Sequence, residues 1–339
     1  MRAWRILALT ALALTGMTAL AAANEDDGIM GNYQGGFTDE AWSGKTLRAQ
    51  VVGLSEKTWK AVLFIGENGQ ETRVEVKGRG RGLDHPAKFD DEVDLGSDLG
   101  GTHTISGVIE KQTFTGTITG GARGAKPGAF TLERATITPP TLGMAPPEGA
   151  VVLYGEGVDP MTMWRRSPEL WCIQGDGSMQ VCDSSLVTRA EYGSGLYHAE
   201  FMTPYMPNER YQGRGNSGFY VLGRYEVQVL DSFGTQPAWD LCGGIYKVAI
   251  PAADAVLPPL QWQTYDITFT APEFDAAGQK TKNARINVVH NGVTVHDNLE
   301  LPNVTPGGVS GDEAVQGVLM LQNHGDPVSY RNIWFKPAE

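Results

Sequence analysis

Apolar and polar residues alternate in short runs along most of the chain, whereas runs with the period of a helix are scarce. Glycine, asparagine or proline bounds most of these runs, and glycine alone accounts for 43 residues. Alternation over about four to eight residues is typical of half-buried β-strands. The pattern therefore predicts an all-β protein.

The strands fall into two groups, as expected for two domains in a chain of 339 residues. Residues 30–138 hold six short runs rich in threonine, valine and glycine: "KTLRAQVVGL", "WKAVLFIG", "ETRVEVKG", "THTISGVIE", "TFTGTITGG" and "AFTLERATI". They predict an accessory β-sandwich or β-roll. Residues 139–150 lie within "TPPTLGMAPPEGA", whose prolines and glycines interrupt a sheet and indicate a linker. The runs in residues 151–339 are longer and predict two packed antiparallel sheets. Within them, Asn291-Gly292 predicts a two-residue hairpin turn.

Residues 1–23 have the pattern of a secretory signal peptide. Arg2 and Arg5 precede an apolar run that ends in three alanines. We therefore expect a secreted or periplasmic protein, and no later segment approaches the roughly 20 apolar residues of a membrane span. Removing the signal takes away two arginines and no acidic residue, so the net charge changes from -12 to -14. Such acidity argues against nucleic acid and anionic membranes as partners and leaves neutral ligands open.

The chain has three cysteines, Cys172, Cys182 and Cys242. The segment "WCIQGDGSMQVC" predicts a hairpin that places Cys172 and Cys182 roughly opposite each other, and export would permit a disulfide. Whether the two pair is left open, and Cys242 would remain free. No cysteine spacing typical of a zinc site is present.

Counting along the longer strands separates an apolar side from a polar side. A wet outer face would explain such alternation, but solvated faces are usually rich in lysine, threonine and serine. The polar sides here carry glutamate, glutamine, asparagine and histidine, which favours one concave binding face. Its candidate residues come from four segments: His198 and Glu200, then Glu226 and Gln228, then Asn287 paired with His296, then Gln322 and His324.

Familiar catalytic motifs are absent, including the nucleophile elbow, the H-E-x-x-H zinc motif, the Walker loop and the dinucleotide fingerprint. Glu200 and Glu226 are a candidate carboxylate pair for ordinary glycoside hydrolysis, although the sequence does not give their separation. Trp239 and Tyr246 are candidate platforms for stacking a sugar ring.

The order of motifs after residue 151 resembles the 3-keto-disaccharide hydrolase family. The matching segments are "YHAEFMTPYMPNERYQGRGNSGFYVLGRYEVQVLDSFG", "CGGIYKVAIP", "PPLQWQTYDITFTAPEFDAAG", "ARINVVHNGVTVHDNLEL" and "LMLQNHGDPVSYRNIWFKP". The resemblance implies a concanavalin-like jelly roll with a sugar site, acting on glycosides already oxidised to a ketone at C3. One departure is Asn323, which stands where the family has aspartate in "QDHG" and puts an acidic role there in question.

The chemistry that this resemblance implies needs no serine nucleophile. A ketone at C3 acidifies the hydrogen at C2, so that a base removes it and the group at C1 leaves; water then adds to the enone. We expect catalytic roles for Glu226, His296, His324 and Glu200, and substrate binding by Asn216, Gln228, Asp231, Tyr246, Gln322 and Arg331. A divalent metal ion held by Glu226 and Asp231 is left open, and no other cofactor is expected.

A non-catalytic, lectin-like carbohydrate-binding module is the competing interpretation, because the jelly roll serves both purposes. Such a module would also need a polar face with aromatic platforms. It would not need histidines placed for proton transfer. The aglycone, the linkage, the end product, the oligomeric state and the role of the first domain are left open.

Overall fold

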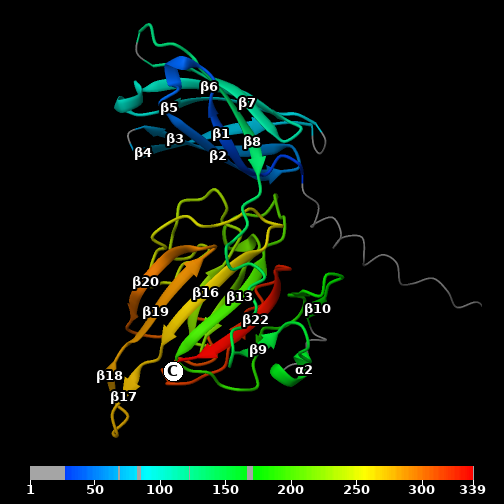
Figure 1. The fold of residues 1–339 in the computed structure, drawn as a ribbon, viewed down its shortest axis with the longest axis vertical. Helices are drawn as coiled ribbons and strands as arrows, with labels where there is room; N and C mark the ends of the chain where they lie inside the picture. Colours follow the sequence, from blue (N-terminus) through cyan, green and yellow to red (C-terminus); the bar gives the residue numbers. More distant parts are fainter. Residues whose placement is uncertain (1–26, 68, 82–84, 122, 166–170, 339) are drawn as a thin grey trace, which may run out of the picture.

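The computed structural model describes residues 27–67, 69–81, 85–121, 123–165 and 171–338 (Figure 1). The predicted signal peptide lies outside this part of the chain. Among the described residues, no helix is long and apolar enough to cross a membrane.

The first group of strands forms a closed antiparallel barrel, not the sandwich or roll that we predicted. Closure comes from β8, which pairs with β1 from Asn32–Ala135 to Phe37–Phe130. Closing the sheet leaves no unpaired edge, and tyrosine, tryptophan and phenylalanine side chains fill its interior. The strands, in barrel order, are β1 (Gly31–Phe37), β2 (Thr46–Ser55), β3 (Thr58–Glu67), β4 (Gln70–Arg79), β5 (Ala87–Asp94), β6 (Thr102–Glu110), β7 (Thr113–Gly120) and β8 (Gly128–Ala135).

The second group forms two packed antiparallel sheets, as the predicted jelly roll requires. The larger sheet has the order β10 (Cys172–Ile173), β11 (Met179–Gln180), β22 (Ser329–Pro337), β13 (Gly195–Met202), β16 (Gln263–Thr270), β19 (Ala284–His290) and β20 (Val293–Leu301), with β9 (Val151–Tyr154) also paired to β22. The smaller sheet has the order β12 (Leu186–Val187), β21 (Met320–Leu321), β14 (Ser217–Val221) and β15 (Tyr225–Val229). Short elements complete the domain: β17 (Glu273–Phe274) pairs with β18 (Lys280–Lys282), and the helical turns are α2 (Pro160–Met163) and the 3-10 turn η5 (Tyr211–Gly213). The barrel has two 3-10 turns, η2 (Glu40–Trp42) and η3 (Ser97–Leu99).

The apolar sides of the two sheets face each other and form one core. Tyr197 and Phe201 from β13 and Ile286 from β19 enter it from the larger sheet, and Val227 and Val229 from β15 enter it from the smaller sheet. The polar sides therefore point away from the core in opposite directions. The prediction of a single polar face is wrong, because the four segments belong to two different sheets.

The Asn291-Gly292 turn is confirmed. Both residues have positive φ, 52° and 83°, and His290 pairs with Val293 across the turn. The expected pairing of Asn287 with His296 is off by one residue: His296 faces Val288, because the ladder shifts its register between Ile286 and Val288.

The cysteine hairpin also forms, and a disulfide joins Cys172 to Cys182. Cys242 is free and buried.

The Pro-rich connection between barrel and sandwich lies against the outer side of the larger sheet. The Gly143 amide donates to Glu200 Oε1 at 2.6 Å, and the Thr141 hydroxyl donates to Asp266 at 2.7 Å. The side-chain amide of Asn332 reaches the Met144 carbonyl at 3.0 Å. The connection is thus held by side chains of β13, β16 and β22.

Candidate active site

A small cavity opens on the outer side of the smaller sheet, with a volume of about 180 Å³. It brings together six of the residues expected from the sequence: Asn216, Glu226, Gln228, Tyr246, Gln322 and His324. Four lining residues were not anticipated: Gln212, Tyr220, Pro306 and Gly307. Tyr220 was within reach of the sequence, since it faces Glu226 across the hairpin. The other three lie in connections, where no periodicity indicates direction.

The hairpin β14–β15 positions the carboxylate at the centre of the cavity. Its register pairs Tyr220 with Glu226 and Gly218 with Gln228, while Val227 points into the core. Gly218 leaves room for the acid, because a Cβ atom there would lie 2.5 Å from Glu226 Oε1. The fixed polarity of this hairpin therefore belongs to the wall of a cavity and not to a solvated surface.

Glu226 is a buried carboxyl without a cationic partner. Its exposed fraction is 3%, and no ion pair involving it occurs in the described part of the chain. Burial raises the pKa of Glu226 to about 7, and the Tyr220 hydroxyl only partly opposes this shift. A carboxyl whose pKa lies near neutrality exchanges protons readily there, as general acid–base catalysis requires.

Four side-chain amides line the cavity beside the acid, those of Gln212, Asn216, Gln228 and Gln322. Asn216 Nδ2 donates to the Gln212 carbonyl at 2.7 Å, and Gln228 Nε2 donates to Gln212 Oε1 at 3.2 Å. Asn216 Oδ1 is buried and accepts no hydrogen bond from any described residue. Since buried acceptors are normally satisfied, this oxygen is available to a hydroxyl group of a ligand.

An aromatic pair borders the cavity. Tyr246 lines it, and Trp239 meets the Tyr246 ring edge-on with 5.2 Å between ring centroids. Trp239 is 37% exposed, so its apolar surface is available for a second group beyond the cavity.

His324 lies in an exposed turn that follows β21. Asn323 shapes this turn, because its Oδ1 accepts a 2.6 Å hydrogen bond from the Gly325 amide. An aspartate would accept the same bond. The departure from the family motif at this position therefore preserves the geometry that presents His324.

Glu200 and Arg331 lie elsewhere, on the outer side of the larger sheet. Arg331 Nε donates to Glu200 Oε2 at 2.7 Å, and Asn332 donates to Glu200 Oε1 at 2.8 Å. Burial alone would raise the pKa of Glu200, but donors from His198, Asn332 and Arg331 together lower it to about 2. The expected pairing of Glu200 with Glu226 in one site is wrong, because the core of the sandwich separates their sheets.

Two other expected site residues support the cavity without lining it. Asp231 forms an ion pair with Arg214, in which Arg214 Nε lies 2.6 Å from Asp231 Oδ2, and both side chains are buried. Burial raises the pKa of Asp231, and the guanidinium opposes the shift. His296 Nε2 donates to the Gly243 carbonyl at 2.8 Å, and burial lowers the pKa of His296. Gly243 in turn donates to the Gln228 carbonyl, so His296 holds the loop that carries Tyr246.

The family of 3-keto-alpha-glucoside-1,2-lyase-like domains matches residues 152–336, more than half of the chain. The chain belongs to this family. The resemblance found in the motifs is thereby confirmed. The match contains the whole cavity and excludes the barrel.

Solved structures similar to this chain come from Parabacteroides distasonis. One, described as a candidate glycosyl hydrolase, is 31% identical, with a TM-score of 0.50 over 57% of this chain and 85% of its own. A second, described in the same way, is 18% identical, with a TM-score of 0.41 over 57% of this chain and 95% of its own. None of the curated proteins matches this chain in sequence.

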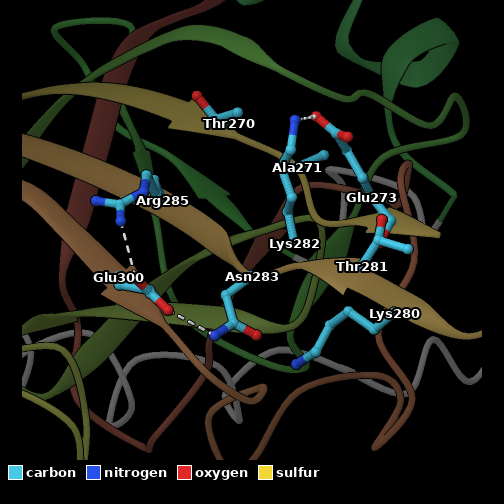
Figure 2. A pocket seen from close by; sticks show the side chains of 9 residues that line it. All are labelled: Thr270, Ala271, Glu273, Lys280, Thr281, Lys282, Asn283, Arg285 and Glu300. Atoms are coloured by element: carbon cyan, nitrogen blue, oxygen red, sulfur yellow. Dashed lines mark hydrogen bonds and ion pairs between the residues drawn. The ribbon is translucent and has the colours of Figure 1, made fainter.

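Two larger cavities contain charged side chains that already bind one another. Figure 2 shows one of about 500 Å³ beside β17 and β18, where Lys282 pairs with Glu273 and Arg285 pairs with Glu300. These exposed charges satisfy each other and leave no group poised to react. Another, of about 700 Å³, adjoins Glu200, whose carboxylate is already bound by Arg331 and Asn332.

The cavity does not assemble a metal site from its own ionisable side chains. Among the described residues, no three of histidine, cysteine, aspartate and glutamate come together to hold an ion. Asp231, the second expected ligand, is bound to Arg214.

Proposed function

We propose that this protein cleaves 3-keto-glycosides by elimination, followed by hydration to give net hydrolysis. The observation that supports this most is the single buried carboxyl of Glu226, with a pKa of about 7, in a cavity of about 180 Å³. Such a volume holds roughly six water molecules, which suits one sugar ring.

The absence of a second carboxylate separates this proposal from ordinary glycoside hydrolysis. Retaining and inverting enzymes both place two carboxyl groups about the scissile bond. Glu226 is the only acidic residue among those that line the described cavity, and no serine or cysteine lines it. One base is sufficient for a substrate whose C3 ketone already acidifies the C2 hydrogen.

In the proposed reaction, Glu226 takes the proton from C2, and the electron pair forms the enolate of the C3 ketone. The enolate then re-forms the ketone, a C1–C2 double bond develops, and the bond from C1 to the leaving oxygen breaks. His324 donates a proton to that oxygen. Water adds to C1 of the enone as hydroxyl and gives its remaining proton to His324, and Glu226 returns a proton to C2, which restores the keto sugar and both side chains.

The amides orient the ring, since Asn216 Oδ1 is free to accept from a sugar hydroxyl. Tyr246 and Trp239 provide an apolar surface for the ring and the aglycone. The Cys172–Cys182 disulfide supports the further proposal that the protein acts after export, in an oxidising compartment.

The test is release of the aglycone from a 3-keto-glucoside, beside the same glucoside without oxidation, with and without a chelator. We expect release from the keto substrate alone, unaffected by the chelator. Binding of both sugars without release of either would contradict the proposal and favour a lectin-like module.

The rate should follow the ionisation of Glu226. Its raised pKa means that the carboxyl is protonated, and inactive as a base, below about pH 7. We expect kcat/KM to rise by about tenfold per pH unit on the acid side, up to about pH 7. The measurement is kcat/KM between about pH 5 and about pH 9, after subtraction of the protein-free rate. A flat profile across this range would show that another group is the base.

A further inference from the structure

The connection between β13 and β14, residues 203–216, carries two residues of the cavity. Gln212 and Asn216 lie at its end, and both line the cavity. Its only regular element is the 3-10 turn η5. A connection of this kind depends on neighbouring structure for its position.

The barrel supplies that neighbouring structure through the end of β2. Arg214 Nη1 donates to the Gly53 carbonyl at 2.9 Å, and Arg210 Nη2 donates to the Leu54 carbonyl at 2.5 Å. The Tyr205 hydroxyl donates to Asp27 at 2.5 Å, and the same carboxylate accepts from Trp59 of the barrel at 2.7 Å. These bonds hold the connection at three points along its length.

Apolar contact and a second loop extend the junction. Val52 of β2 is part of the core of the sandwich, although it belongs to a barrel strand. Arg73 of β4 donates to the Gly234 carbonyl at 2.8 Å, close in sequence to the Asp231 that pairs with Arg214. Figure 1 shows the barrel seated over the end of the sandwich from which these loops extend.

We propose that the barrel is a positioning element for the active site, and that the end of β2 fixes residues 203–216 so that Asn216 and Gln212 keep their place beside Glu226. The inference rests on the proposed function and assigns a role to the domain outside the family match. Because Arg214 bonds both Gly53 and Asp231, a displacement at the junction is transmitted to the strand ends that flank the cavity. A misplacement of about 1 Å can lower a rate by about 100-fold.

The test is the variant Gly53→Ala in the full chain, with Gly36→Ala as its matched control. A Cβ atom at Gly53 would overlap the Tyr205 hydroxyl, which is buried and bonded, so the connection must move. A Cβ atom at Gly36, also in the barrel, meets nothing within 4 Å. We expect kcat/KM to fall by about 10- to 100-fold in Gly53→Ala and to stay within about twofold in Gly36→Ala.

Two further readouts separate positioning from general damage. Displacing the connection admits water to Glu226, so the pH midpoint of kcat/KM should fall in Gly53→Ala. Amide hydrogen exchange should quicken in residues 203–216 while the barrel strands keep their protection. If Gly53→Ala does not fold, the variant Tyr205→Phe tests the positioning role instead. It removes one hydrogen bond of the junction, and the Asp27 carboxylate keeps its hydrogen bond from Trp59. We expect a fall of about three- to tenfold there, from the loss of one hydrogen bond.

The outcomes distinguish this inference from the proposed function. A wild-type protein active on the keto substrate, with Gly53→Ala equal to Gly36→Ala, would overturn the positioning role and leave the function standing. A wild-type protein without activity would overturn the function. In that case, amide hydrogen exchange of residues 203–216 in Gly53→Ala, compared with the wild type, tests the positioning role alone. Faster exchange in the variant supports the role, and unchanged exchange refutes it.

Discussion

Replacing Glu226 by glutamine should lower kcat on a 3-keto-glucoside by about 10²- to 10⁴-fold, the contribution of a positioned base. Glutamine has nearly the same shape as the acid, so the cavity keeps its geometry while the group that takes the C2 proton is lost. The measurement is the initial rate of aglycone release under substrate saturation.

The same substitution should also stabilise the fold at alkaline pH. Folding raises the pKa of Glu226 from its ordinary 4.5 to about 7, so the folded state binds the proton more tightly than the unfolded state. Wild-type stability therefore falls as the pH rises from about 4.5 through about 7, by up to roughly 3 kcal/mol. Because glutamine does not ionise, the free energy of unfolding of the variant should not fall over this pH range.

Glu300→Gln is the matched control for both effects. Glu300 is a half-exposed carboxylate on β20 of the larger sheet, is paired with Arg285, and does not line the cavity. Its substitution should leave the rate unchanged. A Glu226→Gln protein that retains more than about a tenth of the wild-type kcat would exclude Glu226 as the base.

Sequence pattern predicted the class of fold and most of the strands, and it failed where residue type opposed strand formation. Two barrel strands were missed, β1 with three glycines and β5 with four acidic residues. Glycine and aspartate are depleted in strands, so propensity argued against both segments. Without β1 and β5 the sheet has no means to close.

The candidate site was predicted in part, for a related reason. Alternation shows which residues of a strand share a side, but it does not show which sheet the strand joins. Glu226 and Gln228 were correctly separated from Val227, and Glu200 from Phe201. Placing the two sets on their correct, separate sheets requires the pairing of β13 with β22 and of β14 with β15. The structure supplies these pairings.

The surroundings of Asp231 bear directly on its role. The resemblance to the family suggested that it binds substrate, whereas the structure places it in a buried pair with Arg214. The two roles make different predictions. A residue that binds substrate affects KM when it is changed, whereas one partner of a buried ion pair affects the stability of the fold.

We therefore expect Asp231→Asn to lower the free energy of unfolding by about 3 to 5 kcal/mol, because the substitution leaves the Arg214 guanidinium buried without a counter-charge. The side chains of this pair are 1% and 7% exposed, whereas those of Glu300 and Arg285 are 52% and 43% exposed. Removing the charge of Glu300 should accordingly cost no more than about 1 kcal/mol. Urea unfolding of the two variants measures both values. Equal, small losses of stability, together with a raised KM in Asp231→Asn alone, would return Asp231 to the substrate-binding role and remove the ion pair from the account of how the barrel holds the site.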